Sequence, residues 1–161
     1  MSQAVYPGSF DPVTYGHLDL IERGLRIFDT VTVAIAKEAG KHPLFSVAER
    51  LEMMREATRA LKGVEVEPFE GLFVDYVEKK KVSVVIRGLR MISDFEYEFQ
   101  MALTNRKLND RIETIFLMPS ENYAYLSSRL IKEAAGLGGR VSYFVPPFVE
   151  KRLKAKLRQS S

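Results

Sequence analysis

Five short runs of apolar, mostly β-branched residues recur along the chain, and a longer segment with helical spacing follows each run. This alternation constrains the fold more than any other feature, because continuous apolar runs are typical of strands buried on both faces of a parallel sheet. Strands joined by helices over short connections form right-handed crossovers. The pattern therefore predicts an α/β, doubly wound sheet of about five parallel strands with helices on both faces. The strands are expected at residues 3–6, 31–36, 64–69, 82–86 and 114–118.

The segments between these runs carry helix signals of their own. Ser46 and Glu49 form a capping box that opens a helix over residues 47–61, and Pro146-Pro147 introduce a basic C-terminal helix. Apolar residues at helical spacing predict further helices over 18–28, 71–80, 94–108 and 127–135. No repeat or linker-like segment interrupts the 161 residues, so we expect a single domain over residues 1–161.

The composition excludes several function classes. The chain contains no cysteine, which rules out disulfides and thiolate metal sites. No apolar run approaches the roughly 20 residues of a membrane span, and no signal-peptide pattern opens the sequence. We therefore expect a cytoplasmic protein with no membrane partner.

A net charge of +3 raises the question of nucleic-acid binding. Residues 150–158 alone carry a charge of +4, which leaves −1 for the rest of the chain. Because the basicity is confined to the last helix, we expect no nucleic-acid partner. A solvated helix face is the favoured interpretation of this helix, and contact with a partner or a polyanion is the alternative.

Ligands of doubly wound sheets bind beyond the carboxyl ends of the strands. A first cluster suited to anions follows the first run, within "PGSFDPVTYGH". Glycines there allow a close backbone approach, and the amides near Ser9, Phe10 and His17 occupy a loop and a helix start where a phosphate would bind. The structural alternative is a helix start with an incidental histidine.

Two further clusters follow the fourth and fifth runs. Arg87 and Arg90 frame "RGLR", and the planar fork of an arginine fits phosphate oxygens. The structural alternative is a pair of surface salt bridges to Asp94 or Glu96. In the third cluster, "SSR" at residues 127–129 opens a helix, where serines are also simple caps. Three such clusters at one predicted sheet edge favour a common site, since chance would scatter them.

Two isolated charges are harder to interpret. A lone acid on a helix, such as Glu98 within "FEYEFQ", is usually solvated or half of an ion pair. Lys41, in the loop after the second run, is either an exposed side chain or a phosphate ligand.

Four segments together resemble, in order and spacing, the motifs of the bacterial phosphopantetheine adenylyltransferases: "YPGSFDPVTYGH", "IRGLR", "DFEYEFQMALTNRKL" and "FLMPSENYAYLSSRLIKE". "TYGH" is similar to the T/HxGH signature that this family shares with cytidylyltransferases and class I aminoacyl-tRNA synthetases, whereas "RGLR" followed by "DFEYE" is more specific. The resemblance implies a Rossmann-like fold and the reaction of ATP with 4′-phosphopantetheine to dephospho-coenzyme A and pyrophosphate. It also implies Mg²⁺, a homohexamer, and feedback by coenzyme A in the penultimate step of coenzyme A biosynthesis.

The same resemblance implies site residues. The catalytic positions are His17, as transition-state stabiliser, with Lys41 and Arg90. The phosphopantetheine positions are Ser9, Lys41, Phe73 and Arg87. The ATP positions are Ser9, Phe10, His17, Gly88, Leu89, Arg90, Glu98, Tyr123, Ala124, Tyr125, Leu126, Ser127, Ser128 and Arg129. Arg129 stands where the family commonly has a third hydroxyl residue, which places an extra cation near the leaving pyrophosphate.

These residues permit a direct mechanism without a general base. A phosphate monoester has a second pKa of about 6, so at pH 7 it is mostly dianionic and can attack the α-phosphorus of ATP in line, with no covalent enzyme intermediate. We expect His17, at a helix N-terminus, to be a neutral donor. No carboxylate cluster is apparent for Mg²⁺, so we expect no protein side chain on the metal. The alternatives are a nucleotidyltransferase using CTP or nicotinamide mononucleotide, and a non-catalytic nucleotide- or RNA-binding module.

Overall fold

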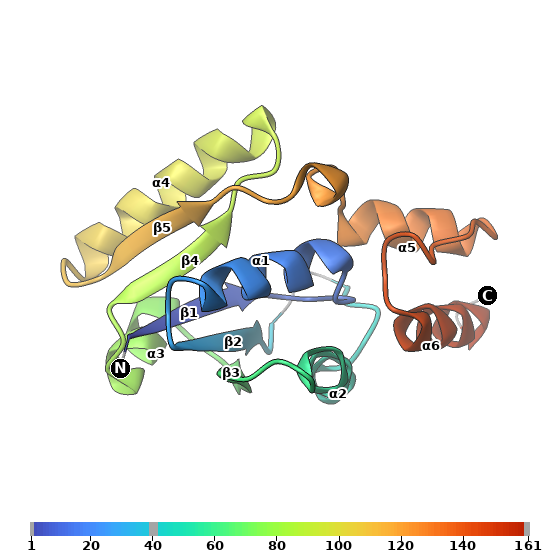
Figure 1. The fold of residues 1–161 in the computed structure, drawn as a ribbon, viewed down its shortest axis with the longest axis horizontal. Helices are drawn as coiled ribbons and strands as arrows, with labels where there is room; N and C mark the ends of the chain where they lie inside the picture. Colours follow the sequence, from blue (N-terminus) through green and yellow to red (C-terminus); the bar gives the residue numbers. More distant parts are fainter. Residues whose placement is uncertain (1, 39–41, 160–161) are drawn as a thin grey trace.

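The computed structural model describes residues 2–38 and 42–159. Five parallel strands form one sheet with the order β3-β2-β1-β4-β5 (Figure 1), which confirms the predicted doubly wound α/β fold. The strands are β1 (Gln3–Gly8), β2 (Thr30–Ala36), β3 (Val64–Phe69), β4 (Val84–Gly88) and β5 (Glu113–Leu117). The helices are α1 (Tyr15–Leu25), α2 (Val47–Thr58), α3 (Phe73–Lys80), α4 (Ile92–Leu108), α5 (Ser128–Gly136) and α6 (Pro147–Gln159), with a short 3-10 helix η1 (Glu121–Tyr123). The winding reverses between β1 and β4, which is where such sheets bind ligands.

Four of the five strands differ from their predicted ranges by one or two residues at one or both ends, and β3 matches its range in full. β1 continues to Gly8, because its last two residues stay in register with β2. β4 begins at Val84 and not at residue 82, because Lys81 ends α3 in a left-handed conformation (φ 59°) and delays the strand. β1 and β4 run in step, with Val5 opposite Val85, and both end in a glycine, at Gly8 and Gly88.

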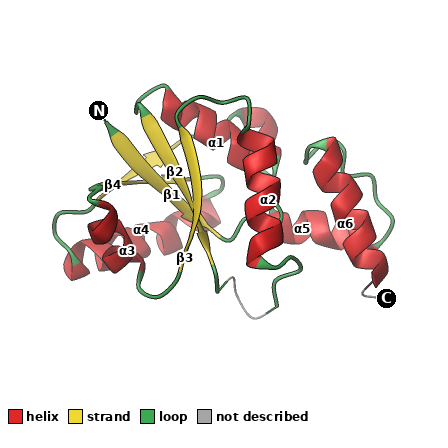
Figure 2. Cartoon of the chain, turned by 90° about the horizontal axis from the view of Figure 1, so that it is seen from below, coloured by secondary structure: helices red, strands yellow, loops and turns green. Residues whose placement is uncertain are grey.

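Alternate residues of the central strands face opposite layers of the fold. Val33 and Ile35 of β2 belong to the main apolar cluster, which includes residues of α1 and α2. Ala34, between them, packs with Val5 and with aromatic side chains of β3 and α3. Figure 2 shows α1 and α2 on one side of the sheet and α3 and α4 on the other. Burial on both faces explains why β1 and β2 are largely apolar runs.

The basic helix α6 packs beside α2, away from the sheet (Figure 1). Arg152 Nη1 lies 3.0 Å from a carboxylate oxygen of Glu52, and Lys156 Nζ lies 2.8 Å from Glu49. The Lys156 ammonium also lies 5.7 Å from the centre of the Phe45 ring. The basic helix is therefore partly neutralised by acids of its own chain, which is a more specific arrangement than a solvated face. No helix within the described residues has the length and apolar character needed to cross a membrane.

Candidate active site

The loop after β1 forms the floor of the candidate site. Phe10 adopts a left-handed backbone conformation (φ 50°), and its ring is buried. The ring packs edge-on against Tyr6 and against His17, with the imidazole centre 4.8 Å away. A Cβ atom at Gly8 would lie 3.0 Å from this ring, so the close approach needs glycine. The Phe10 ring therefore supports the imidazole from within the protein.

His17 sits in the first turn of α1 and takes part in its N-terminal capping. The Thr14 backbone N–H donates to His17 Nδ1 at 3.0 Å, and the His17 backbone N–H donates to Thr14 Oγ1 at 3.3 Å. Because Nδ1 accepts a hydrogen bond, the proton of the neutral ring lies on Nε2. The imidazole thus offers one N–H donor, in a fixed orientation, to the cavity that it lines.

The electrostatic surroundings keep this ring neutral. Burial lowers the pKa of His17 to about 3, and the positive charges of Arg90 and Arg87 contribute in the same direction. The sequence led us to expect a neutral donor for a different reason, the positive end of the α1 dipole. The structure assigns the larger effect to desolvation and to the two arginines, which come from a distant part of the chain.

Arg87, at the end of β4, is engaged by a carboxylate of α4. Its Nε and Nη2 donate to the two Glu98 oxygens at 2.9 and 2.6 Å, and Nη1 donates to the Pro7 carbonyl at 2.7 Å. Burial alone would lower the pKa of Arg87, but the hydrogen bonds and the charge of Glu98 outweigh it and raise that pKa. Glu98 is itself buried. The ion-pair interpretation therefore holds for Glu98. Arg87 pairs with this residue and not with Asp94 or Glu96, the acids considered from the sequence.

Arg90 links two of the predicted clusters. Its Nη1 donates to the Leu126 carbonyl, in the loop before α5, and its Nε lies 3.4 Å from Asp94. The sequence-based alternative of a salt bridge to Asp94 is thus present at Arg90. This arginine holds the loop after β4 against the loop before α5.

The segment after β5 is fixed by polar contacts at both ends. Ser120 donates to Asp19 of α1 through its backbone N–H at 2.8 Å and its hydroxyl at 2.6 Å. The Ser127 hydroxyl caps α5 by accepting from the Leu130 N–H at 3.4 Å, as the capping alternative predicts. The Ser128 hydroxyl donates to the Pro12 carbonyl at 2.8 Å. These contacts bind the segment to α1 and to the loop after β1.

A polar cavity of about 330 Å³ lies where these loops meet. Residues from all three clusters line it, so the structure brings together side chains that are separated by more than a hundred positions. The predicted site residues among them are Ser9, Phe10, His17, Arg87, Gly88, Arg90, Glu98, Tyr123, Leu126, Ser127, Ser128 and Arg129. Three arginines, an imidazole and several hydroxyl groups thus line the cavity, together with the acids Asp94 and Glu98 and some apolar residues.

A second cavity of about 300 Å³ adjoins the first and has a different character. Phe69 and Phe73 line it from β3 and α3, and Met101 and Ala102 line it from α4. The two cavities share Pro7, Gly8, Ser9, Arg87 and Glu98. The Arg87–Glu98 pair thus stands at the junction of a polar and a mostly apolar space.

Some predicted residues lie elsewhere. Leu89, Ala124 and Tyr125 line neither cavity, and the Tyr125 side chain is exposed against the Phe144 ring. Arg129 borders the polar cavity, but its side chain is 84% exposed and lies 3.5 Å from Glu133. Lys41 falls outside the described residues.

Three residues that organise the site were not singled out from the sequence: Asp11, Asp19 and Arg50. Burial would raise the pKa of Asp19, but hydrogen bonds from Ser120 and Arg23 bring it below its ordinary value. Asp11 and Arg50 are buried. Asp11 lies within the first cluster, "PGSFDPVTYGH", which is a usable signal. Arg50 lies on the same helical face as the buried Met53 and Met54, so the spacing within α2 is a usable signal, although its charge alone argues for exposure.

No group of three or more His, Asp or Glu side chains could hold a metal ion anywhere in residues 2–38 and 42–159.

Comparisons with known proteins identify the family. Residues 5–134 match the cytidylyltransferase-like family model. The phosphopantetheine adenylyltransferase of Caldanaerobacter subterraneus subsp. tengcongensis is 56% identical over 160 residues, which cover 99% of this chain and 100% of that protein. The one of Desulfosudis oleivorans is 53% identical, over 98% and 94% of the two chains. The chain belongs to the phosphopantetheine adenylyltransferase family.

Membership in the phosphopantetheine adenylyltransferase family confirms the resemblance inferred from the four motifs. A solved structure from Vibrio parahaemolyticus, provisionally named a nicotinate-nucleotide adenylyltransferase, superimposes with a TM-score of 0.75. It covers 100% of this chain and 98% of its own, at 17% sequence identity. At that identity the likeness concerns the fold, and it confirms the Rossmann-like architecture.

Proposed function

We propose that this protein transfers the adenylyl group of ATP to 4′-phosphopantetheine, giving dephospho-coenzyme A and pyrophosphate in the penultimate step of coenzyme A synthesis. The observation that carries the proposal is the junction of two unlike cavities at Ser9 and Arg87. The polar cavity, with His17 and two arginines, suits the triphosphate of a nucleotide. The mostly apolar cavity suits an extended pantetheine arm, so the two reactants meet at the shared wall.

At this wall an oxygen of the phosphopantetheine phosphate attacks the α-phosphorus of ATP in line. The new P–O bond forms as the bond between the α-phosphorus and the bridging oxygen breaks, and pyrophosphate leaves with the electron pair. The attacking dianion has no proton to lose, so no base is needed. Glu98 is held by Arg87 in two hydrogen bonds, which fits an orienting role better than that of a base.

The roles divide between the two reactants. His17 donates through Nε2–H to the α-phosphoryl oxygens as charge develops there, and Arg90 with residues 127–129 binds the β- and γ-phosphates. Ser9 contacts both reactants, and the Phe10 amide binds ATP. Gly88, Glu98, Tyr123 and Leu126 complete the nucleotide site from the wall of the polar cavity. Leu89, Ala124 and Tyr125, which line neither cavity, adjoin these residues in the chain and belong to the proposed site on the family resemblance. Arg87 and Lys41 bind the attacking phosphate, and Phe73 binds the pantetheine arm.

Mg²⁺ belongs to this proposal as a partner of the phosphates. The ion would neutralise charge on the triphosphate, and the lack of an acidic cluster in the described residues is consistent with coordination by substrate oxygens.

The proposal extends to a cytoplasmic homohexamer with coenzyme A as feedback ligand at the active site. Support for self-association comes from α4, whose outer face exposes large apolar side chains. Phe95 and Phe99 stack there with ring centres 5.6 Å apart and are 47% and 48% exposed. Tyr97, Leu103 and Leu108 of the same helix are also exposed.

Pyrophosphate release from ATP, measured with and without 4′-phosphopantetheine, tests the reaction. We expect release only when the acceptor is present, with dephospho-coenzyme A as the second product by mass spectrometry. Parallel assays with CTP as donor and nicotinamide mononucleotide as acceptor should give little release. Acceptor-independent release, or a preference for either alternative, would refute the proposal, and salt-sensitive RNA binding without turnover would favour a binding module.

A further inference from the structure

Arg50 is the largest of the fully buried side chains, with 1% exposure, and it lines neither cavity. Its guanidinium donates to four backbone carbonyls instead. Nε donates to Phe45 at 3.1 Å, and Nη2 donates to Lys37 at 3.2 Å. Nη1 donates to both Ser9 at 3.0 Å and Ala36 at 2.7 Å. One side chain thus joins the loop after β1, the end of β2 and the loop before α2.

The charge of Arg50 has no carboxylate partner at salt-bridge distance in the described part of the chain. Burial lowers the pKa of Arg50, and the negative charge of Asp11 opposes that effect. A guanidinium stays protonated under such conditions and presents its donors in a rigid planar fork. A lysine ammonium has three donors around one atom, so it cannot reach the same four carbonyls.

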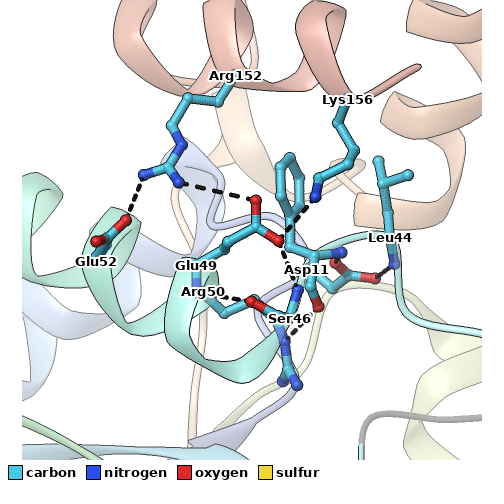
Figure 3. A network of polar contacts seen from close by, with 9 residues as sticks. Asp11, Leu44, Ser46, Glu49, Arg50, Glu52, Arg152 and Lys156 are labelled. Atoms are coloured by element: carbon cyan, nitrogen blue, oxygen red, sulfur yellow. Dashed lines mark hydrogen bonds and ion pairs between the residues drawn. The ribbon is translucent and has the colours of Figure 1, made fainter. Parts of the chain in front are cut away.

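Asp11 holds the same loop before α2 through the backbone N–H groups of that loop. Its carboxylate accepts the backbone N–H of Leu44 at 2.8 Å and of Phe45 at 2.9 Å, and it pairs with Lys132 of α5 at 3.0 Å. The Phe45 backbone is therefore held at its N–H by Asp11 and at its carbonyl by Arg50. Figure 3 shows Asp11, Arg50 and Leu44 gathered beneath α6, next to the Glu49–Lys156 contact.

The held segments border the junction of the two cavities. Ser9 lines both cavities, and Ala36 and Glu38 line the apolar one. We propose that Arg50 is a positioning residue, which fixes the Ser9 backbone relative to the end of β2 and so sets the place of the acceptor phosphate. This inference rests on the proposed function, because it takes the apolar cavity as the acceptor site.

Arg50→Lys tests the inference, with Arg55→Lys as the matched control. Arg55 lies on the same helix, is exposed, and donates to a single carbonyl, that of Val66, at 3.3 Å. For the Arg50 variant we expect kcat to fall about 10- to 100-fold and the KM for 4′-phosphopantetheine to rise about 10-fold, because small displacements of a bound reactant carry penalties of that size. The KM for ATP should rise less, by about threefold at most, since only Ser9 of the four carbonyl residues lines the nucleotide cavity, whereas both Ser9 and Ala36 line the acceptor cavity. The Arg55 variant should match the wild type in all three constants.

A merely structural arginine would give a different result. The Arg50 variant would then unfold at a lower temperature yet keep wild-type constants in the folded state, and this outcome would overturn the proposal, as would equal rises in both KM values. Asp11→Asn serves as a second variant, because its amide can accept only one of the two N–H groups, and it should show the same pattern more weakly.

If neither variant folds, both residues serve the whole fold and the positioning role is wrong. The proposed function is tested separately with the wild-type protein. If that protein shows no acceptor-dependent pyrophosphate release, the proposed function is wrong, whatever the Arg50 variant does.

Discussion

The low pKa of His17 makes the stability of the protein depend on pH in a calculable way. Burial and two arginines lower this pKa from 6.5 to about 3 in the folded protein. Between these values the unfolded chain binds a proton that the folded chain does not, so acid favours unfolding by about 1.4 kcal/mol per pH unit. The contribution is fully present above the unfolded pKa and is lost as the pH falls towards the folded one. From pH 7 to pH 5, His17 should therefore cost about 2 kcal/mol of stability.

Urea unfolding of the wild type and of His17→Gln at pH 7, 6 and 5 measures this contribution. Carboxylates titrate similarly in both proteins, so the difference between their free energies of unfolding isolates His17. With a slope of about 2 kcal/mol per molar urea, the difference between the two midpoints should change by about 1 M from pH 7 to pH 5. His42→Gln removes an exposed loop histidine and is the matched control, which should follow the wild type.

Parallel midpoints for wild type and His17→Gln across this pH range would refute the reasoning. They would mean that the folded imidazole takes up its proton as readily as the unfolded one. A second readout is the ¹⁵N shifts of the imidazole at pH 6, which should show Nδ1 without a proton and Nε2 with one. The opposite tautomer would contradict the hydrogen bond from the Thr14 backbone.

Three further predictions concern turnover and binding. His17→Ala should lower kcat about 10²- to 10³-fold through loss of one preorganised donor, while calorimetry finds ATP affinity within a few fold; near-wild-type turnover would remove His17 from the mechanism. Arg87→Ala should weaken 4′-phosphopantetheine far more than ATP in the same calorimetric assay, and equal losses would mean that this arginine is misassigned. Arg129→Ala should raise the KM for ATP several-fold through loss of a positive charge beside the phosphates. The melting temperature should not change, because the Arg129 side chain is 84% exposed. An unchanged KM would show that this arginine does not bind ATP.

The strands could be predicted because their signal is local. The strands β1 and β2 are buried along most of their length and are largely apolar, whereas the edge strands β3 and β5 are only partly buried and include Glu65, Glu67 and Glu113. The five predicted runs nevertheless correspond to the five observed strands. The start of β4 was harder to place, since Val82 is apolar and buried but belongs to the turn after α3. An apolar residue reports burial, whereas strand membership depends on pairing with a neighbour.

The convergence of three clusters was also predictable, because the topology brings the carboxyl ends of parallel strands to one edge. The hydrogen-bond and ion-pair partners of the individual site residues could not be predicted. Arg87 selects Glu98 and the Pro7 carbonyl, the latter 80 positions away, and Arg50 reaches the Ser9 carbonyl over 41 positions. Such pairings depend on the final packing of helices against the sheet, and no spacing within α2 or α4 encodes them.

The Arg87–Glu98 pair raises the question of how an arginine already bound to a carboxylate can also bind a phosphate. A guanidinium has five N–H donors. Glu98 takes one on Nε and one on Nη2, and Pro7 takes one on Nη1, so one N–H on each terminal nitrogen stays available among these contacts. The Glu98 carboxylate thus orients the guanidinium and keeps it protonated, while two N–H groups remain for a phosphate. In the proposed mechanism Arg87 therefore need not exchange partners when the acceptor enters. Keeping the buried pair intact would avoid the heavy cost of leaving Glu98 as an isolated buried charge.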